Sequence, residues 1–494
     1  MLPDTPASSR PSPFGVDVLT LVTGTTIAQI ITVLASPVIT RLYGPETFGI
    51  LALFTSITSV ISVVACMRYE LAIMLPESDA EAANVFGLSV IFVFIVSLVS
   101  FIPLFLFQQP LLQFLNAPQL GPFFWLIPLT IFVSGIFLAL NYWNTRTKHF
   151  HRLSTARVVS SCASTGAQLG MGFLGYASGG ALIGASILGK IVSTLALGIQ
   201  IMRDHLSFFK QNISWNGMKN ALKRYSNFPK YDIWSALLNT ISWQIPIFLL
   251  SFFFSTTVVG YYSLGMMMIQ LPMSLIGSAI AQVFYQRAAE AKREGTLASL
   301  VENVFKILIV IGLFPILILT IIGQDFFSVV FGQIWAEAGV YTQILSIWAL
   351  VLFISSPLST LYVALEKQEF GLLVNSANFI TRLLSLLIGG WLGSVYIALL
   401  LFAVSGILVY GFLCLKLLKF SGVKKNNIDK IIFSNCLGFL PAGIIILTLK
   451  LLNQNSIILV CVSSLILAVY YGYVSVMDKQ IKNLVRIILK RKNC

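Results

Sequence analysis

The feature that most constrains this chain is a series of apolar runs, each roughly twenty residues long, separated by short polar connections. A helix of that length spans the hydrocarbon core of a bilayer. Transmembrane strands would be shorter and would alternate in polarity, so the runs are predicted to be helices. The predicted spans are 16–40, 48–67, 83–106, 123–145, 155–175, 179–202, 232–254, 258–284, 303–322, 340–362, 371–392, 395–418, 431–449 and 456–477. The expected fold class is an all-α integral membrane protein with about fourteen transmembrane helices.

The composition agrees with this prediction and excludes several kinds of function. Of the 494 residues, 57% are hydrophobic and only 10% are charged, whereas soluble domains carry about a quarter charged residues. No polar stretch between the runs is long enough for a separate soluble domain, and no GxxxxGK[ST] motif could cradle ATP. The six cysteines include no CxxC pair, and the three histidines do not have metal-ligand spacing. We therefore expect no enzyme activity, catalytic residue, metal or cofactor.

The basic residues are distributed unevenly among the connections. If the N-terminus is cytoplasmic, 27 of the 32 Lys and Arg residues fall on the cytoplasmic side. Only Arg41 and Lys450 fall outside, and Lys190, Lys306 and Arg382 lie within spans. Because cytoplasmic loops are enriched in Lys and Arg, the pattern predicts that both termini are cytoplasmic. It also accounts for the net charge of +14 without a nucleic acid partner.

Two spans share a pattern that indicates an internal repeat. Asp17 in the first span and Asp232 in the seventh each precede a glutamine by twelve residues. A glycine then lies near the start of the following helix, at Gly49 and Gly260. An offset of six helices preserves orientation, so we expect two six-helix bundles related by a parallel pseudo-two-fold axis.

The predicted domains follow from this repeat and from the basic stretches. They are an N-terminal six-helix bundle (1–202), a cytoplasmic basic linker (203–230), a C-terminal six-helix bundle (231–418), two additional C-terminal helices (419–477) and a tail (478–494). The tail places apolar and basic side chains on opposite faces of a helix, which is typical of a helix lying on the membrane surface.

Four charged residues near or inside spans are candidate functional residues. An ionised base at depth in a membrane is costly, so Lys190 and Arg382 are expected to face a polar cavity, although Arg382 is close enough to the end of its span to snorkel. Asp17 and Asp232 lie at the starts of their helices, where two interpretations remain open. They complement the helix dipoles, or they exchange a coupling proton or sodium ion.

Three motifs in the first 150 residues resemble those of polysaccharide-export flippases. They are Thr40-Arg-Leu-Tyr-Gly-Pro-Glu-Thr-Phe-Gly49, Arg68-Tyr-Glu-Leu-Ala-Ile-Met-Leu-Pro76 and Tyr142-Trp-Asn-Thr-Arg146. This family is the Wzx-like branch of the MATE-like multidrug/oligosaccharidyl-lipid/polysaccharide superfamily. The resemblance implies two helical bundles around a central V-shaped cavity, with two extra C-terminal helices.

The resemblance also implies a substrate and partners. The substrate would be an undecaprenyl-diphosphate-linked oligosaccharide, moved to the periplasmic leaflet of a bacterial inner membrane for O-antigen, capsule or exopolysaccharide synthesis. Membrane lipids, a polysaccharide polymerase and a chain-length regulator are the other implied partners. A diphosphate crossing lipid needs cationic groups. The candidates are Arg41, Arg68, Arg146, Lys190 and Arg382, with Asp17 and Asp232 as candidates for ion coupling during alternating access.

Two other functions remain as alternatives. A drug/cation antiporter of the same superfamily would favour acidic over basic residues in its cavity, whereas this sequence has more deep bases than deep acids. A membrane-embedded polysaccharide polymerase or ligase would need catalytic groups on an outward loop. The outward loops predicted here are short and nearly uncharged.

Overall fold

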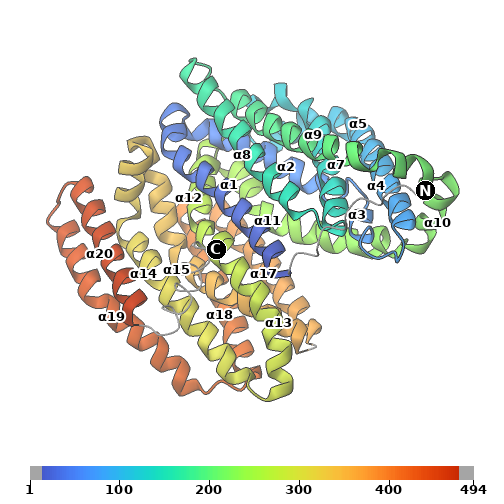
Figure 1. Cartoon of the computed structure of the whole chain (residues 1–494). Helices are drawn as coiled ribbons and strands as arrows, with labels where there is room; N and C mark the ends of the chain where they lie inside the picture. Colours follow the sequence, from blue (N-terminus) through green and yellow to red (C-terminus); the bar gives the residue numbers. More distant parts are fainter. Residues whose placement is uncertain (1–13, 366, 478–494) are drawn as a thin grey trace. The chain divides into compact units, whose positions relative to one another are not determined.

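The computed structural model describes residues 14–365 and 367–477, and within these ranges the chain is helical and contains no strand (Figure 1). The all-α fold class predicted from the apolar runs is confirmed. The amphipathic tail predicted at 478–494 lies outside the described residues, and so does the side chain of Asp17.

In the described ranges, twelve helical segments are long and apolar enough to cross a membrane. The other two predicted spans are helical as well. The run at 155–175 forms α8 (Phe150–Phe173), which is rich in serine and threonine, and the run at 258–284 begins with α12 (Thr256–Pro272). After Pro272, a π-helical turn η3 (Met273–Gly277) leads into α13 (Ser278–Glu294). The count of fourteen spans stays a prediction.

The chain divides into two compact units. Unit 1 comprises Met1–Leu42, Phe54–Leu112 and Gln119–Ile241, and unit 2 comprises Tyr43–Leu53, Gln113–Pro118 and Ser242–Cys494. The helices α2 (Pro45–Ser62) and α11 (Ile233–Phe253) each contribute residues to both units. The predicted domain boundaries are not tested by this division and stay a prediction.

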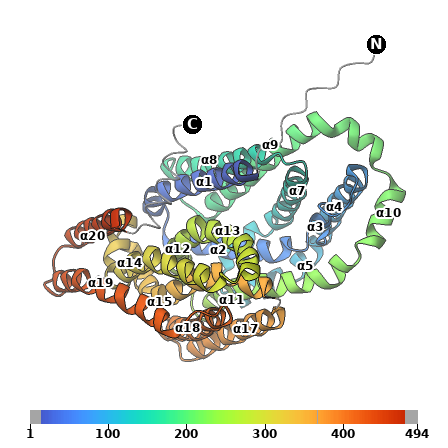
Figure 2. The same cartoon turned by 60° about the horizontal axis from the view of Figure 1, so that its bottom comes forward.

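Unit 1 contains all or part of each helix from α1 to α10, and α1, α8 and α9 lie side by side (Figure 2). Besides α2 and α8, its elements are α1 (Phe14–Leu42), α3 (Tyr69–Ala72), α4 (Asp79–Val99), α5 (Phe101–Leu106), α6 (Gln108–Phe114), η1 (Pro118–Phe123), α7 (Leu126–Arg146), α9 (Gly179–Asn212), α10 (Trp215–Arg224) and η2 (Phe228–Asp232). Trp143 of α7 is fully buried, and its ring contacts those of Phe86 and Phe209. This aromatic cluster packs α4, α7 and α9 together.

Unit 2 is built around α14 and α15. Its remaining elements are α14 (Leu297–Phe331), η4 (Gln333–Trp335), α15 (Ala336–Leu358), α16 (Thr360–Ala364), α17 (Gln368–Trp391), α18 (Val395–Phe420), α19 (Lys425–Leu451) and α20 (Ser456–Met477). Phe353 of α15 and Leu308 of α14 are buried in its core. The last two helices, α19 and α20, flank α14 (Figure 1).

Serine residues begin several helices that follow short turns. The Oγ atoms of Ser178, Ser255 and Ser394 accept hydrogen bonds from backbone N–H groups three residues later, at 3.3, 3.3 and 3.4 Å. A serine N-cap satisfies one of the N–H groups left free in the first helical turn. All three serines lie in the short connections predicted to face outward. Each cap lets a helix begin directly after a short turn.

The starts of α2 and α12 cross closely within unit 2. A β-carbon at Gly49 would overlap the carbonyl group of Thr256, and a β-carbon at Gly260 would overlap that of Pro45. The contact is reciprocal, because each glycine faces the residue four positions before the other. Only glycine permits such an approach of two backbones. These are the two glycines that the sequence pattern pairs, and the repeat itself stays a prediction.

Candidate functional site

Arg68 lies in a strained turn between α2 and α3 of unit 1. Its φ angle is 64°, and that of the preceding Met67 is 50°, so two successive residues other than glycine adopt the left-handed conformation. This conformation is uncommon for residues with a β-carbon, and it persists only where surrounding contacts hold it. The turn ends the apolar run of α2 and precedes the short α3 helix.

An ion pair joins this turn to the segment that precedes α11. Arg68 Nε donates to Asp232 Oδ2 at 2.6 Å, and Arg68 Nη1 donates to Glu70 Oε1 at 3.3 Å. Asp232 is the last residue of the π-helical turn η2. Such turns are frequent at functional sites in helices. The structure thus brings together Arg68 and Asp232, which the sequence assigned to two separate roles.

Glu70 is the most buried member of this cluster. Its side chain is 1% exposed, compared with 22% for Arg68 and 40% for Asp232. Its Oε2 atom has no hydrogen-bond partner among the described residues. Burial raises the pKa of Glu70 from 4.5 to about 7, against the opposing effects of a backbone hydrogen bond and of Arg68, while the charge of Asp232 adds to the rise. Desolvation therefore dominates, and Glu70 titrates near neutral pH.

Arg146 forms a second ion pair in unit 1. Its Nε donates to Asp79 Oδ1 at 2.9 Å, and its Nη1 donates to the carbonyl oxygen of Ile73 at 3.0 Å. Ile73 follows directly after α3, so Arg146 anchors the segment that also carries Arg68 and Glu70. The second and third motifs that resemble those of the flippases therefore lie together at one end of unit 1. The charge pattern predicts that this end is cytoplasmic.

The other predicted residues lie in different surroundings. Lys190 Nζ donates to Ser134 Oγ at 3.3 Å and is half-buried. Arg41 is exposed and donates to the carbonyl oxygen of Pro37 at 3.0 Å. Asp17 belongs to α1, and its side chain is not described. These three residues, together with Arg68, Arg146 and Asp232, belong to unit 1.

Arg382 belongs to unit 2 and is only 3% exposed. Its Nη2 donates to the hydroxyl of Tyr410 at 2.9 Å, and its Nη1 donates to Ser242 Oγ at 3.4 Å. The guanidinium carbon lies 4.4 Å from the centre of the Trp243 ring, a cation–π contact. Aromatic faces and neutral oxygens thus surround this deep cation, and the predicted exposure to an aqueous cavity stays a prediction.

Sequence reasoning missed Glu70 and Asp79, the acidic partners of Arg68 and Arg146. Both acids are visible in the sequence, because Glu70 lies inside the second motif and Asp79 follows it by nine residues. An acid placed two residues after a base at the end of a span could have been recognised as a neighbour in the same cluster. The pairing of Arg68 with Asp232 depends on tertiary contacts between segments distant in sequence.

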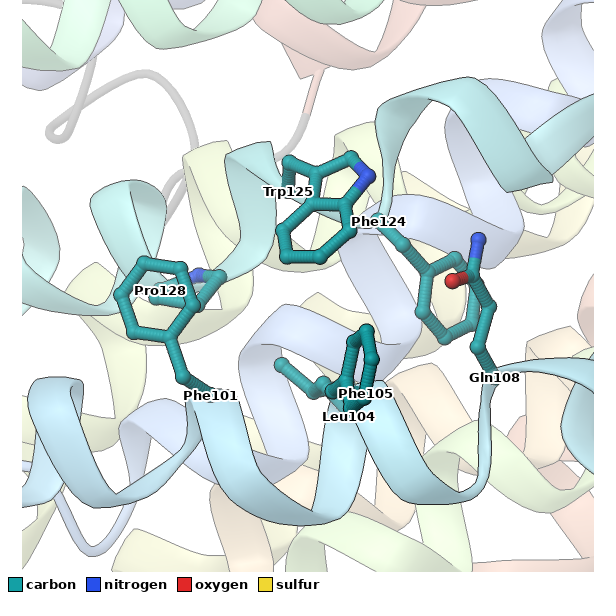
Figure 3. Close-up of a pocket in the computed structure, with 7 residues that line it drawn as sticks. All are labelled: Phe101, Leu104, Phe105, Gln108, Phe124, Trp125 and Pro128. Carbon is teal, nitrogen blue, oxygen red and sulfur yellow. The ribbon is translucent and has the colours of Figure 1, made fainter.

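A cleft between α5 and the start of α7 is too small to bind a substrate. It has a volume of about 10 Å³ and is lined mainly by aromatic residues (Figure 3). The rings of Phe105 and Trp125 lie 6.0 Å apart, and Gln108 Nε2 donates to the carbonyl oxygen of Gly121 at 3.1 Å. A space of this size holds at most one water molecule. The charged cluster around Arg68 is therefore the better candidate in unit 1.

Comparison with known proteins places the chain in a family. The model of the family described as "Polysaccharide biosynthesis protein" matches residues 38–340, more than half of the chain. The chain belongs to this family. Its match includes the segments that carry Arg41, Arg68, Arg146, Lys190 and Asp232. A relative from Bacillus subtilis (strain 168), "Teichuronic acid biosynthesis protein TuaB", is 22% identical over 272 residues. That alignment spans 53% of this family member and 53% of the relative.

Solved structures show how this family member folds. The inward closed conformation of the lipid II flippase MurJ matches with a TM-score of 0.69 and 12% identity, over 95% of this chain and 100% of that one. An inward-facing multidrug resistance MATE family transporter of the MOP superfamily matches with a TM-score of 0.59 and 16% identity, over 81% of this chain and 98% of that one. The chain shares its fold with these two proteins. The two bundles, the central cavity and the two extra C-terminal helices stay predictions.

Proposed function

We propose that this protein is a flippase that moves an undecaprenyl-diphosphate-linked oligosaccharide from the cytoplasmic to the periplasmic leaflet of a bacterial inner membrane. Membership of a polysaccharide biosynthesis family and the fold shared with a lipid II flippase support this proposal. The observation that carries it is the Arg68–Asp232 ion pair, because it provides a cation whose anionic partner can be exchanged.

The diphosphate of the substrate competes with Asp232 for Arg68. A guanidinium presents paired N–H donors that match phosphate oxygens as well as carboxylate oxygens. Arg68 is partly exposed and already engages two carboxylates. Ion coupling is proposed at the same carboxylate. A proton or sodium ion held by Asp232 is released when the substrate binds, and it is thereby exchanged against the substrate during alternating access.

Arg146, Lys190, Arg41 and Arg382 remain candidate contacts for the substrate at other stages of transport. Arg146 also fixes the segment that carries Arg68, through its bond to Ile73. Asp17 remains the second candidate for ion coupling, at the position in α1 that corresponds to Asp232 in the predicted repeat. The inner-membrane location and the cytoplasmic termini belong to the same proposal.

A charge-exchange experiment distinguishes a substrate-binding role of Arg68 from a purely structural one. The single variants Arg68→Asp and Asp232→Arg place like charges together and should lose surface polysaccharide in the native host with its own gene deleted. The double variant restores opposite charges. We expect it to recover membrane abundance and melting temperature but to transport at less than a tenth of the normal rate, because the cation has moved from its position.

The control is the exposed pair Arg224–Glu81, whose atoms lie 3.2 Å apart in the same unit. The variant Arg224→Gln should transport normally, since exposed ion pairs contribute little. Full recovery of transport in the Arg68→Asp/Asp232→Arg double variant would show that the pair only holds the fold together. Reconstituted vesicles carrying Asp232→Asn should in addition lose their response to an imposed proton or sodium gradient.

A further inference from the structure

A basic helix of unit 1 presents two large apolar side chains on its exposed surface. The helix is α10, which lies beside α4 in Figure 2. Trp215, at its start, is 72% exposed, and Leu222, about two turns later, is 38% exposed. Two residues seven positions apart lie on the same face of a helix. The two side chains therefore form one apolar stripe, and neither has been assigned to the site around Arg68.

Hydrogen bonds fix how α10 is oriented against the rest of unit 1. Asn84 of α4 accepts a hydrogen bond from the backbone N–H of Ser214 at 2.9 Å and donates one to the carbonyl oxygen of Asn212 at 2.8 Å. Near the other end of α10, the Tyr69 hydroxyl donates to the carbonyl oxygen of Leu222 at 3.2 Å. Because both ends of the helix are held, the exposed stripe is a fixed feature of the fold.

The contacts of α10 with α4 place it at the level of the membrane boundary. The spanning helix α4 begins with the charged residues Asp79 and Glu81, which belong outside the hydrocarbon core. A β-carbon at Gly87, about two turns later, would lie 3.2 Å from Ile213 and 3.3 Å from Met218, just before and within α10. Since α10 packs against the first turns of a spanning helix, we expect its exposed stripe to lie among lipid headgroups.

Two lysines border the apolar stripe. Lys219 and Lys223 follow Trp215 by one and two helical turns. Neither lysine side chain forms an ion pair or a hydrogen bond within the part of the chain that the structure describes. Basic residues at the surface of a membrane attract anionic lipids.

The acids in the first turn of α4 do not neutralise these lysines, because each is paired with an arginine. Glu81 Oε2 lies 3.2 Å from Arg224 Nη1, and Asp79 Oδ1 lies 2.9 Å from Arg146 Nε. Each pair has no net charge. The stripe on α10 therefore combines exposed apolar surface with uncompensated positive charge, a combination typical of helices that lie on a membrane.

We propose that anionic phospholipids of the adjacent leaflet bind along this stripe, with their phosphates at Lys219 and Lys223 and their acyl chains against Trp215 and Leu222. The indole ring of a tryptophan is suited to the membrane interface, and lysine stems lie along apolar surface while their charged ends reach the headgroups. An acidic soluble partner would also match the lysines. The position of α10 against the first turns of α4 favours lipid. This inference is independent of the transport proposal.

Quenching of Trp215 fluorescence by brominated lipids tests the inference. The full-length protein is reconstituted into phosphatidylcholine vesicles that contain a small fraction of phosphatidylglycerol, and an equal amount of one lipid or the other carries bromine on its acyl chains. The signal of Trp215 is the difference between the unaltered protein and Trp215→Phe. We expect brominated phosphatidylglycerol to quench this signal more strongly than brominated phosphatidylcholine, and the preference to decrease at high salt.

Charge variants of α10, each measured with and without Trp215→Phe, show which residues set the preference. Lys219→Gln and Lys223→Gln should each reduce the preference for phosphatidylglycerol by about fivefold, the effect of one basic residue near a membrane surface. Arg224→Gln is the matched control, because it removes a base of the same helix whose charge is already paired with Glu81. It should keep the preference. All three variants should melt at the temperature of the unaltered protein, since exposed charges contribute little to stability.

Two results would overturn the inference. One is a Trp215 signal that neither brominated lipid quenches, which would place the stripe in water and leave it free for a soluble partner. The other is equal quenching by the two lipids, or a preference that neither lysine variant reduces, which would show apolar contact without recognition of charge. Neither result depends on whether the protein transports polysaccharide precursors.

Discussion

At the scale of single residues, the cluster of Arg68, Glu70 and Asp232 has an unbalanced charge. One cation faces two carboxylates, and the more buried carboxylate, Glu70, has an oxygen without a hydrogen-bond partner in the described part of the chain. A buried carboxylate in this position favours its protonated form. The cluster is therefore neutral when Glu70 carries a proton and negative when it does not.

The raised pKa of Glu70 predicts how stability depends on pH. Between pH 4.5 and about 7, the folded protein holds a proton on Glu70 that the unfolded chain releases. Stability contributed by this proton is complete below pH 4.5 and is lost as the pH rises through about 7. The expected loss is on the order of 3 kcal/mol.

Thermal unfolding in detergent at a series of pH values measures this effect. The variant Glu70→Gln, which resembles the protonated acid, should melt at a temperature that varies less with pH across this window. The variant Glu81→Gln, which changes an exposed acid of the same unit, should retain the pH dependence of the unaltered protein. Identical pH profiles for Glu70→Gln and the unaltered protein would contradict the assignment.

At the scale of helices, the sequence predicts where each helix lies along the chain better than it predicts which segments contact one another. The long apolar runs of α4, α14 and α18 are evident from composition, because a run of that length has few alternatives to a membrane-spanning helix. The segment 258–284 is less regular, because Pro272 ends α12 and a π-helical turn follows. No property of the sequence around Asp232 reveals that Arg68 will contact it, since the contact depends on how a left-handed turn directs one side chain.

The crossing of α2 and α12 gives a prediction at this scale. Replacing Gly49 or Gly260 with alanine forces a β-carbon into the opposite backbone, which cannot move aside as a side chain can. Each substitution should destabilise the protein by about 1–3 kcal/mol, the range for overpacked interiors, or more. Melting temperature and the amount of protein in the membrane measure the effect.

Gly411→Ala in α18 is the matched control, because a β-carbon there would meet no atom within 4 Å. It should be neutral or slightly stabilising, since alanine favours a helix more than glycine does. If Gly49→Ala and Gly260→Ala melted at the same temperature as Gly411→Ala, the two backbones would not be in contact.

At the scale of the whole molecule, the charge pattern predicts orientation. Connections carrying most of the basic residues should be cytoplasmic, including the stretch before η2 and the turn between α18 and α19. Reporter fusions after Ser226 and after Val423 should give cytoplasmic signals, for example fluorescence without alkaline phosphatase activity.

A fusion within the short connection between α8 and α9, after Tyr176, is the matched outward position. It should show alkaline phosphatase activity. Periplasmic signals from both basic connections would reverse the orientation and the proposed direction of transport.

The start of α2 is synthesised long before the rest of the unit to which it belongs. Tyr43–Leu53 belongs to unit 2, yet most of that unit begins only at Ser242. The ribosome adds about 5–20 residues each second, so Gly49 waits on the order of 10–40 s before Gly260 has been made. Throughout this interval, Gly49 of α2 lacks the helix that it contacts in the folded protein. Insertion of α2 must therefore rely on its own apolar character, and α12 joins a helix that is already in place.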